Sequence, residues 1–124
     1  MKTPNVVDSS AWLDYFADTG GAPAFAAAIE DTDRLIVPVV CIYEVFKKFL
    51  RERGASQALQ AAAQMQSGRV VELDLALALE AARLKLPLAD SLIYATAQRH
   101  GATLWTQDEH FKDLPGVRYF ANIV

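Results

Sequence analysis

The sequence has few cysteines and no long apolar runs, the features that form disulfide bonds or cross a membrane. Cys41 is the one cysteine among 124 residues, which excludes an internal disulfide framework and predicts a small core residue. No apolar run reaches the roughly 18 residues that cross a bilayer, and the stretch MKTPNVVDSS at the start holds too few apolar residues for a signal peptide. These absences predict a cytoplasmic protein with no membrane partner.

Histidine is scarce as well. The sequence has two histidines, His100 and His110, and neither has a second ligand at the spacing of a zinc site. Both are therefore predicted to be structural.

No excess of positive charge marks the chain as a general nucleic-acid binder. It has 12 Lys and Arg against 15 Asp and Glu, and the net charge of −3 disfavours a broad nonspecific grip on phosphates. A local basic strip beside an acidic pocket is compatible with this balance. In the segment KKFLRER (47–53), Lys47, Lys48 and Arg51 share one helix face and are candidates for contacting phosphates. The alternative is a solvated helix end whose cations favour the helix dipole.

Linkers, low-complexity tracts and internal repeats are absent, so residues 1–124 are predicted to form a single domain. Short apolar runs that favour strands alternate with longer helical patterns. The predicted strands are 5–7, 35–37, 70–73, 103–105 and 117–120, and the predicted helices are 10–16, 23–30, 39–53, 57–66, 75–84 and 89–100. This alternation predicts an α/β fold in three layers, with a central, mainly parallel sheet of about five strands between helices.

Four acidic residues fall where such a fold would bring them together. Asp8 ends the first strand, Asp108 follows the fourth, Asp90 opens the last long helix, and Glu44 lies in the first turns of the helix 39–53. Ligand sites of parallel sheets form beyond the carboxyl ends of the strands, so the topology predicts that all four acids meet at one edge. Like charges that lie so close together repel one another, and a divalent cation between them relieves this repulsion. Ligands that are all oxygen favour Mg²⁺ or Mn²⁺.

Each acid also has a local interpretation. Asp8 and Asp90 could cap the helices that follow them, and Asp108 could be a turn residue before a short helix. Glu44 could pair on the surface with the lysines three and four residues later. The apolar residues around Glu44 instead predict that it is partly buried.

Four segments in this order resemble the PIN domain family, and within it the VapC-type toxins of toxin–antitoxin pairs. The segments are NVVDSSAWLDYF, IYEV, LADSLIYATA and TLWTQDEHF, and they run from the first strand to near the C-terminus. Carried over position by position, the family's acidic residues are Asp8, Glu44, Asp90 and Asp108. Thr106 matches the hydroxyl residue of the TxD element, and Ser9 matches a small polar position beside the first aspartate.

The resemblance implies a Mg²⁺-dependent endoribonuclease that hydrolyses phosphodiester bonds in RNA. Asp8, Asp90 and Asp108 would then hold Mg²⁺ or Mn²⁺, and Glu44 would act through a water or as a base. Ser9 and Thr106 would orient the carboxylates. Lys47, Lys48 and Arg51 would lead the RNA to the metal.

The same resemblance implies two kinds of protein partner. A cognate VapB-type antitoxin would hold the toxin inactive in a hetero-oligomer, and the toxin would pair with itself as a homodimer. Trp12, Tyr15 and Phe16 lie at helical spacing and are predicted to face the core. Alternatively, some of them form a groove for an amphipathic segment of the antitoxin.

Two other function classes compete with the nuclease. A receiver-like signalling domain has a similar length and alternation, but it needs an acidic pair after the first strand and a late lysine. Here Asp8 is followed by serines, and the late strand ends in Thr-Gln-Asp. A PIN-fold binding module without catalysis would keep the fold, but the presence of all four acids argues against it.

Overall fold

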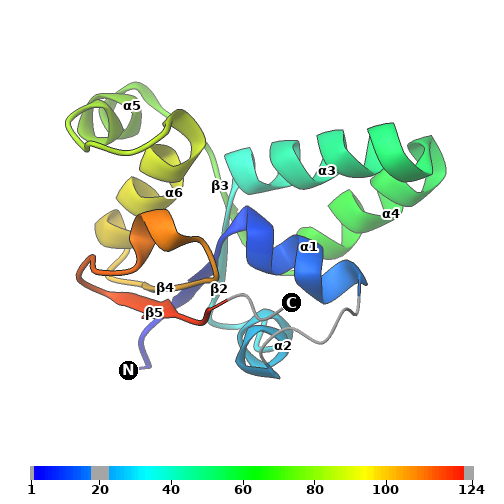
Figure 1. Cartoon of the computed structure of the whole chain (residues 1–124), viewed down its shortest axis with the longest axis horizontal. Helices are drawn as coiled ribbons and strands as arrows, with labels where there is room; N and C mark the ends of the chain where they lie inside the picture. Colours follow the sequence, from blue (N-terminus) through cyan, green and yellow to red (C-terminus); the bar gives the residue numbers. More distant parts are fainter. Residues whose placement is uncertain (1, 18–22, 122–124) are drawn as a thin grey trace.

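The short apolar runs of this chain form one parallel sheet. The computed structural model describes residues 2–17 and 23–121, and its sheet has the strand order β3-β2-β1-β4-β5 with all four pairings parallel (Figure 1). The strands are β1 (Asn5–Val7), β2 (Leu35–Pro38), β3 (Arg69–Val71), β4 (Thr103–Thr106) and β5 (Val117–Tyr119). The central strands β1 and β2 are buried along their whole length, because helices cover both faces of the sheet.

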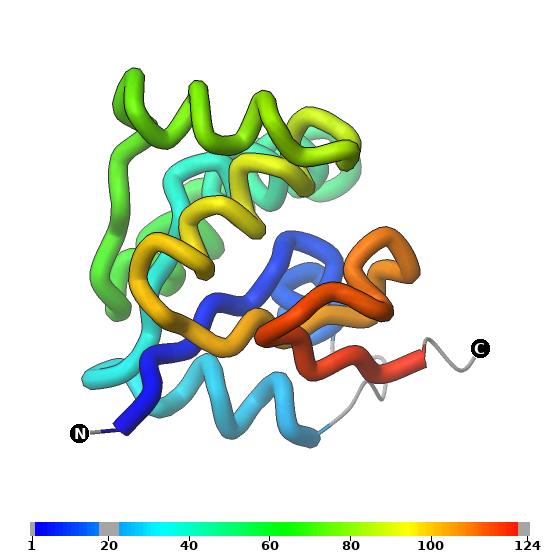
Figure 2. The backbone as a smooth tube through the Cα atoms, turned by 90° about the vertical axis from the view of Figure 1, so that its left-hand side faces the viewer, coloured from blue at the N-terminus to red at the C-terminus, as the bar shows by residue number. Residues whose placement is uncertain are grey.

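Helices flank the sheet in two layers. Within the described residues they are α1 (Ser9–Ala17), α2 (Pro23–Glu30), α3 (Val39–Arg53), α4 (Ala55–Met65), α5 (Leu75–Ala82), α6 (Leu88–Arg99) and the 3-10 turn η1 (Glu109–Phe111). Figure 1 shows α5 and α6 on the left of the sheet and α1, α3 and α4 on the right. Figure 2 shows α5 above α6, so that α6 lies between α5 and the sheet. None of the described helices is long and apolar enough to cross a membrane.

The predicted α/β fold with a central parallel sheet is confirmed, and its element bounds differ from the prediction by at most a few residues. For example, α4 begins at Ala55 rather than at residue 57. The reason is that a single residue, Gly54, ends α3 and precedes α4. Its φ of 91° is left-handed, a conformation that glycine adopts without steric cost.

The strand order decides against one alternative. Receiver-like doubly wound domains have the order 2-1-3-4-5, with the third strand next to the first. Here β4 and β2 are the neighbours of β1, and β3 lies at the edge. The receiver-like interpretation is therefore wrong.

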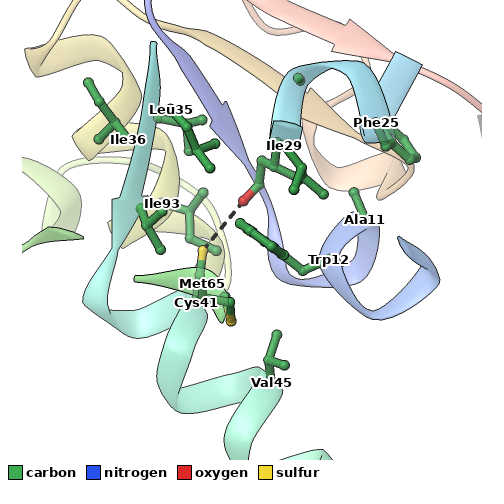
Figure 3. Close-up of a cluster of buried hydrophobic side chains, with 14 of the residues drawn as sticks. Ala11, Trp12, Phe25, Ile29, Leu35, Ile36, Cys41, Val45, Met65 and Ile93 are labelled. Atoms are coloured by element: carbon green, nitrogen blue, oxygen red, sulfur yellow. Dashed lines mark hydrogen bonds between the residues drawn. The ribbon is translucent and has the colours of Figure 1, made fainter. Parts of the chain in front are cut away.

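One cluster of buried apolar side chains joins the sheet to its helices. Figure 3 shows part of this cluster, with Trp12 from α1, Ile29 from α2 and Met65 from α4. Cys41 is a buried core residue, as predicted, and its Sγ lies 3.7 Å from the carbonyl oxygen of Val7. This contact fixes the start of α3 against the end of β1.

The predicted core position of Trp12 is confirmed, since this side chain is buried. Tyr15 and Phe16 are partly buried and pack against the core, with the Phe16 ring 5.6 Å from the Trp12 ring. The three aromatic residues thus pack α1 against the core, and the Phe16 ring also lies 5.6 Å from the Phe49 ring of α3.

We expect Leu104→Ala to lower the free energy of unfolding by about 2–5 kcal/mol, because removing a buried isobutyl group leaves a cavity. Leu104 lies in β4 and is 0% exposed. The matched control is Leu59→Ala on α4, where the side chain is 61% exposed and the change should stay within about 0.5 kcal/mol. Urea unfolding followed by circular dichroism measures both, and equal losses would contradict the packing described here.

Candidate functional site

The four acidic residues predicted from the sequence do meet in the structure. Asp8, Glu44, Asp90 and Asp108 all line one pocket of about 290 Å³. Asp8 directly follows β1 and Asp108 lies two residues after β4, while Asp90 and Glu44 come from the first turns of α6 and α3. The pocket therefore lies where parallel strands end, as the topology predicts.

Asp8 is the most deeply buried of these acids, with 2% of its surface exposed. Its Oδ1 accepts hydrogen bonds from the Ser10 hydroxyl at 2.9 Å and from the Ala11 backbone N–H at 3.1 Å, and its Oδ2 accepts one from Thr106 at 2.9 Å. Burial nevertheless raises the pKa of Asp8 to about 7, and the charge of Asp108 adds to the rise. At neutral pH this carboxyl group is therefore partly protonated, and a cation beside it would favour its ionised form.

Thr106 links two of the acids. Its hydroxyl is fully buried, donates to Asp8, and accepts the backbone N–H of Asp108 at 2.9 Å. The pairing of β1 with β4 brings these residues together, because Val7 lies opposite Trp105 in the parallel register. Thr106 has the contacts expected of a residue that orients the carboxylates.

Asp90 and Asp108 share a neighbour that the sequence analysis did not assign to the site. The Nδ1 atom of His110 lies 3.0 Å from Asp90 Oδ2 and 2.9 Å from Asp108 Oδ1. The sequence analysis assigned His110 a structural role, and these two contacts make it a candidate member of the site. The signal in the sequence was its position two residues after Asp108, which puts both on one tight turn. Ser10, which also contacts Asp8, was missed in the same way.

The pKa of Asp90 is raised to about 6. Burial is the main cause, since the side chain is 15% exposed, and the charge of Asp108 adds to the rise while His110 opposes it. Two of the four acids thus hold protons more tightly than free carboxylates do, which is the signature of a crowded anionic pocket.

Ser9 contacts a different acid from the one beside it in sequence. Its hydroxyl donates to Glu44 Oε1 at 2.5 Å, across 35 positions of the chain. Glu44 is half-buried, so the prediction of partial burial is confirmed. The nearby Lys48 forms its ion pair with Glu52, at 3.3 Å.

The three predicted phosphate-binding cations differ in their positions. Lys48 lines the pocket. Lys47 lies over the ring of Tyr43, with Nζ 5.5 Å from the ring centre, and Arg51 lies 3.6 Å from Glu52. Of the three, Lys48 is the cation that the structure brings to the acids.

The capping interpretations hold for two of the acids. Asp8 accepts the Ala11 N–H at the start of α1, and Asp108 accepts the His110 N–H at 2.9 Å and so caps η1. Asp90 is not a cap, because α6 begins at Leu88 and Asp90 lies inside its first turn. All three carboxylates still reach the pocket, so capping and ion binding are compatible.

The donor set suits a hard divalent cation. Three aspartates and a glutamate supply oxygen atoms, and within the described residues one ligand atom each from Asp90, Asp108 and His110 lies within 4.8 Å of the others. Among the residues that the structure describes, Lys48 is the one cationic side chain that lines this pocket. Mg²⁺ and Mn²⁺ take such ligands.

The architecture and this acidic pocket agree with the comparison to known families. The family model described as the PIN domain matches residues 6–117. The chain belongs to the PIN domain family. The matched region includes all four acids, together with Thr106 and His110. Among curated proteins, no match to the chain was found.

Solved structures with the same fold include toxin–antitoxin components. A toxin–antitoxin complex from Klebsiella pneumoniae is 22% identical, with a TM-score of 0.76 over 95% of this PIN domain chain and 99% of that chain. DNA-bound VapBC from Salmonella typhimurium is 14% identical, with a TM-score of 0.74 and coverage of 97% and 98%. VapC20 of Mycobacterium tuberculosis, a sarcin-ricin loop cleaving toxin, is 17% identical, with a TM-score of 0.69 and coverage of 91% and 96%.

For the PIN domain without divalent ions, we expect the free energy of unfolding to fall as the pH rises from about 4 to about 7. The pKa of Asp8 is about 7 in the folded chain instead of its ordinary 3.8, so the folded state binds this proton more tightly. The resulting stabilisation is complete below the unfolded pKa and is lost as the pH rises through the folded one. Urea unfolding in EDTA across this range measures the slope.

Asp8→Asn should flatten a large part of that slope, and Asp90 should account for some of the rest. The asparagine keeps the acceptor for the Ala11 N–H, and its amide can donate to Thr106. Asp33→Asn, at an exposed position, is the matched control and should leave the slope intact. Identical slopes in the wild type and in Asp8→Asn would contradict the assignment.

Proposed function

We propose that this PIN domain chain is a divalent-metal-dependent endoribonuclease and the toxin of a toxin–antitoxin pair. The observation that carries the proposal is the convergence of Asp8, Glu44, Asp90 and Asp108 on one pocket. Support also comes from the fold shared with toxin–antitoxin complexes and with a toxin that cleaves the sarcin-ricin loop. The chain would act in the cytoplasm, where RNA is available.

In this proposal Asp8, Asp90 and Asp108 hold Mg²⁺ or Mn²⁺. When bound, the ion supplies polarisation of the phosphodiester and lowers the pKa of a water molecule. Glu44 accepts a proton from the attacking water, directly or through a second water. The short hydrogen bond from Ser9 orients the Glu44 carboxylate for this step, at 2.5 Å.

Three hydrogen-bond donors fix the orientation of the Asp8 carboxylate. Ser10, Ala11 and Thr106 occupy positions around its two oxygens, which limits the directions from which an ion or proton can reach them. Such orientation by surrounding donors maintains a ligand set while substrates enter and leave. Thr106 contacts both Asp8 and the backbone of Asp108, so its loss would disturb both residues together.

RNA must approach an acidic pocket on a chain of net charge −3. The bound ion offsets part of this repulsion, and we assign the nearest basic contact to Lys48, which lines the pocket. Lys47 and Arg51, which come before and after Lys48 in α3, would contact phosphates outside the pocket. Both are exposed and follow the same helix toward Gly54.

We expect recombinant wild type to cleave total RNA with Mg²⁺ or Mn²⁺ and to stop in EDTA. Asp8→Asn and Asp90→Asn should each lower the rate about 100-fold or more, because outer contacts of a metal site alone are worth about 10–100-fold. Asp33→Asn should cleave like the wild type. Gel analysis of RNA with matched protein amounts measures the rates.

The same experiment separates the nuclease from a PIN-fold binding module without catalysis. A binding module would retain RNA in a gel-shift assay but leave it uncut at every metal concentration. Equal cleavage by the wild type and Asp8→Asn would point to a contaminating ribonuclease and would contradict the assigned site.

The proposed partner is a VapB-type antitoxin, with the chain also pairing with itself. A groove of about 440 Å³ lies between α1, α3 and α4 and has Phe16, Phe49 and Ala61 beside polar residues of α4. An amphipathic antitoxin segment would lay its apolar side on the two phenylalanines, whose rings are 5.6 Å apart. Of the three aromatic residues considered from the sequence, Phe16 is the one that lines this groove.

Expression of the wild type without a partner should arrest bacterial growth, because the proposed enzyme would cut cellular RNA. Asp90→Ala should abolish the arrest, whereas Asp33→Ala should retain it. Growth after induction measures the effect, with immunoblotting to match protein levels. Equal growth of all three strains at equal protein levels would contradict the toxin assignment while leaving cleavage in vitro to be judged separately.

A further inference from the structure

His110 contacts two acids of the pocket, Asp90 and Asp108, and the segment that carries it is packed against α6. His110 lies in η1. The residue after it, Phe111, is fully buried and stacks on Tyr94 of α6, with ring centres 6.4 Å apart. The Tyr94 hydroxyl donates to the Pro115 carbonyl at 2.8 Å, which ties the segment after η1 to the same helix. Figure 1 shows η1, in orange, beside α6. Because Asp90 lies one turn before Tyr94, these contacts fix His110 relative to Asp90.

Two contacts to Asp108 add a second restraint on the position of His110. The His110 N–H donates to Asp108 Oδ1 at 2.9 Å, and the His110 ring reaches the same oxygen with Nδ1 at 2.9 Å. The side chain as a whole is 58% exposed, so burial does not force the ring inward. Its direction follows from the carboxylates that it meets.

The two distances from His110 Nδ1 to the carboxylate oxygens match those between neighbouring ligand atoms around one ion. In octahedral coordination with bonds of about 2.1 Å, adjacent ligand atoms lie about 3.0 Å apart. Nδ1 of His110 lies 3.0 Å from Asp90 Oδ2 and 2.9 Å from Asp108 Oδ1. An ion held by both carboxylates would therefore lie within bonding reach of this nitrogen.

We propose that His110 is a direct nitrogen ligand of the metal ion, so that the centre has mixed oxygen and nitrogen coordination. This inference rests on the metal dependence in the proposed function and adds a ligand to it. The neutral imidazole offers the Nδ1 lone pair, and the proton stays on Nε2 at the exposed side. An imidazole nitrogen is a ligand type that transition ions accept more readily than Mg²⁺ does, and the paramagnetic Mn²⁺ ion makes such a nitrogen detectable.

The test uses Mn²⁺ bound to tag-free protein, because an affinity tag would supply imidazoles of its own. Pulsed electron paramagnetic resonance should detect the ¹⁴N coupling of a ring nitrogen in the wild type. The coupling should vanish in His110→Gln, and the affinity for Mn²⁺ from calorimetry should fall about tenfold or more.

His100→Gln is the matched control. His100 ends α6, ten residues after Asp90, and is about 15 Å away along the helix. This variant should keep both the ¹⁴N coupling and the affinity. Circular dichroism checks that each variant is folded, and the wild-type spectrum decides the question even if His110→Gln is unstable.

Two outcomes overturn the inference in different ways. Mn²⁺ bound to the wild type without ¹⁴N coupling would mean that His110 moves aside and the ligands are all oxygen, and the proposed nuclease would stand. No binding of Mn²⁺ to the wild type would overturn this inference and the proposed metal-dependent function together.

Discussion

The buried charge of Asp8 is the constraint on which this site depends. A carboxylate at the end of a central strand loses most of its hydration, and an unpaired buried charge is costly. Three hydrogen bonds offset part of this cost but leave the pKa near 7. The pocket around Asp8 adds further negative charge, so it stabilises a cation more than it stabilises the empty state. The burial that makes the Asp8 charge unfavourable alone would make Asp8 an effective ligand in the proposed metal site.

The parallel sheet supplies the geometry that this constraint requires. β1 and β4 are separated by almost the whole chain, yet their register brings Thr106 to Asp8 across 98 positions. The core attached to β1, which includes Trp12 and the Cys41 contact to Val7, holds that strand from one side. The packing that stabilises the fold therefore also positions Asp8, because β1 is part of the core and Asp8 directly follows it.

The second half of the site depends on α6. This helix carries Asp90 in its first turn and Tyr94 one turn later, and Tyr94 contacts both Phe111 and Pro115. Arg99 near the end of α6 pairs with Asp74 at 3.0 Å and with Glu80 at 3.3 Å, which attaches α5 to its outer side. A helix fixed at both ends in this way holds one acid and, through η1, orients a second acid and a histidine.

The amino-acid sequence by itself determined the kinds of element and their order, because hydrophobic periodicity and helix-ending glycines such as Gly54 act locally. It also determined that Asp8 and Asp108 follow strands, which is enough to place them at one sheet edge. Tertiary structure alone decided the strand order, the pairing of Ser9 with Glu44, and the approach of His110 to Asp90. Those contacts depend on how helices distant in sequence pack and on how side chains turn once buried, and neither leaves a periodic signal in the chain.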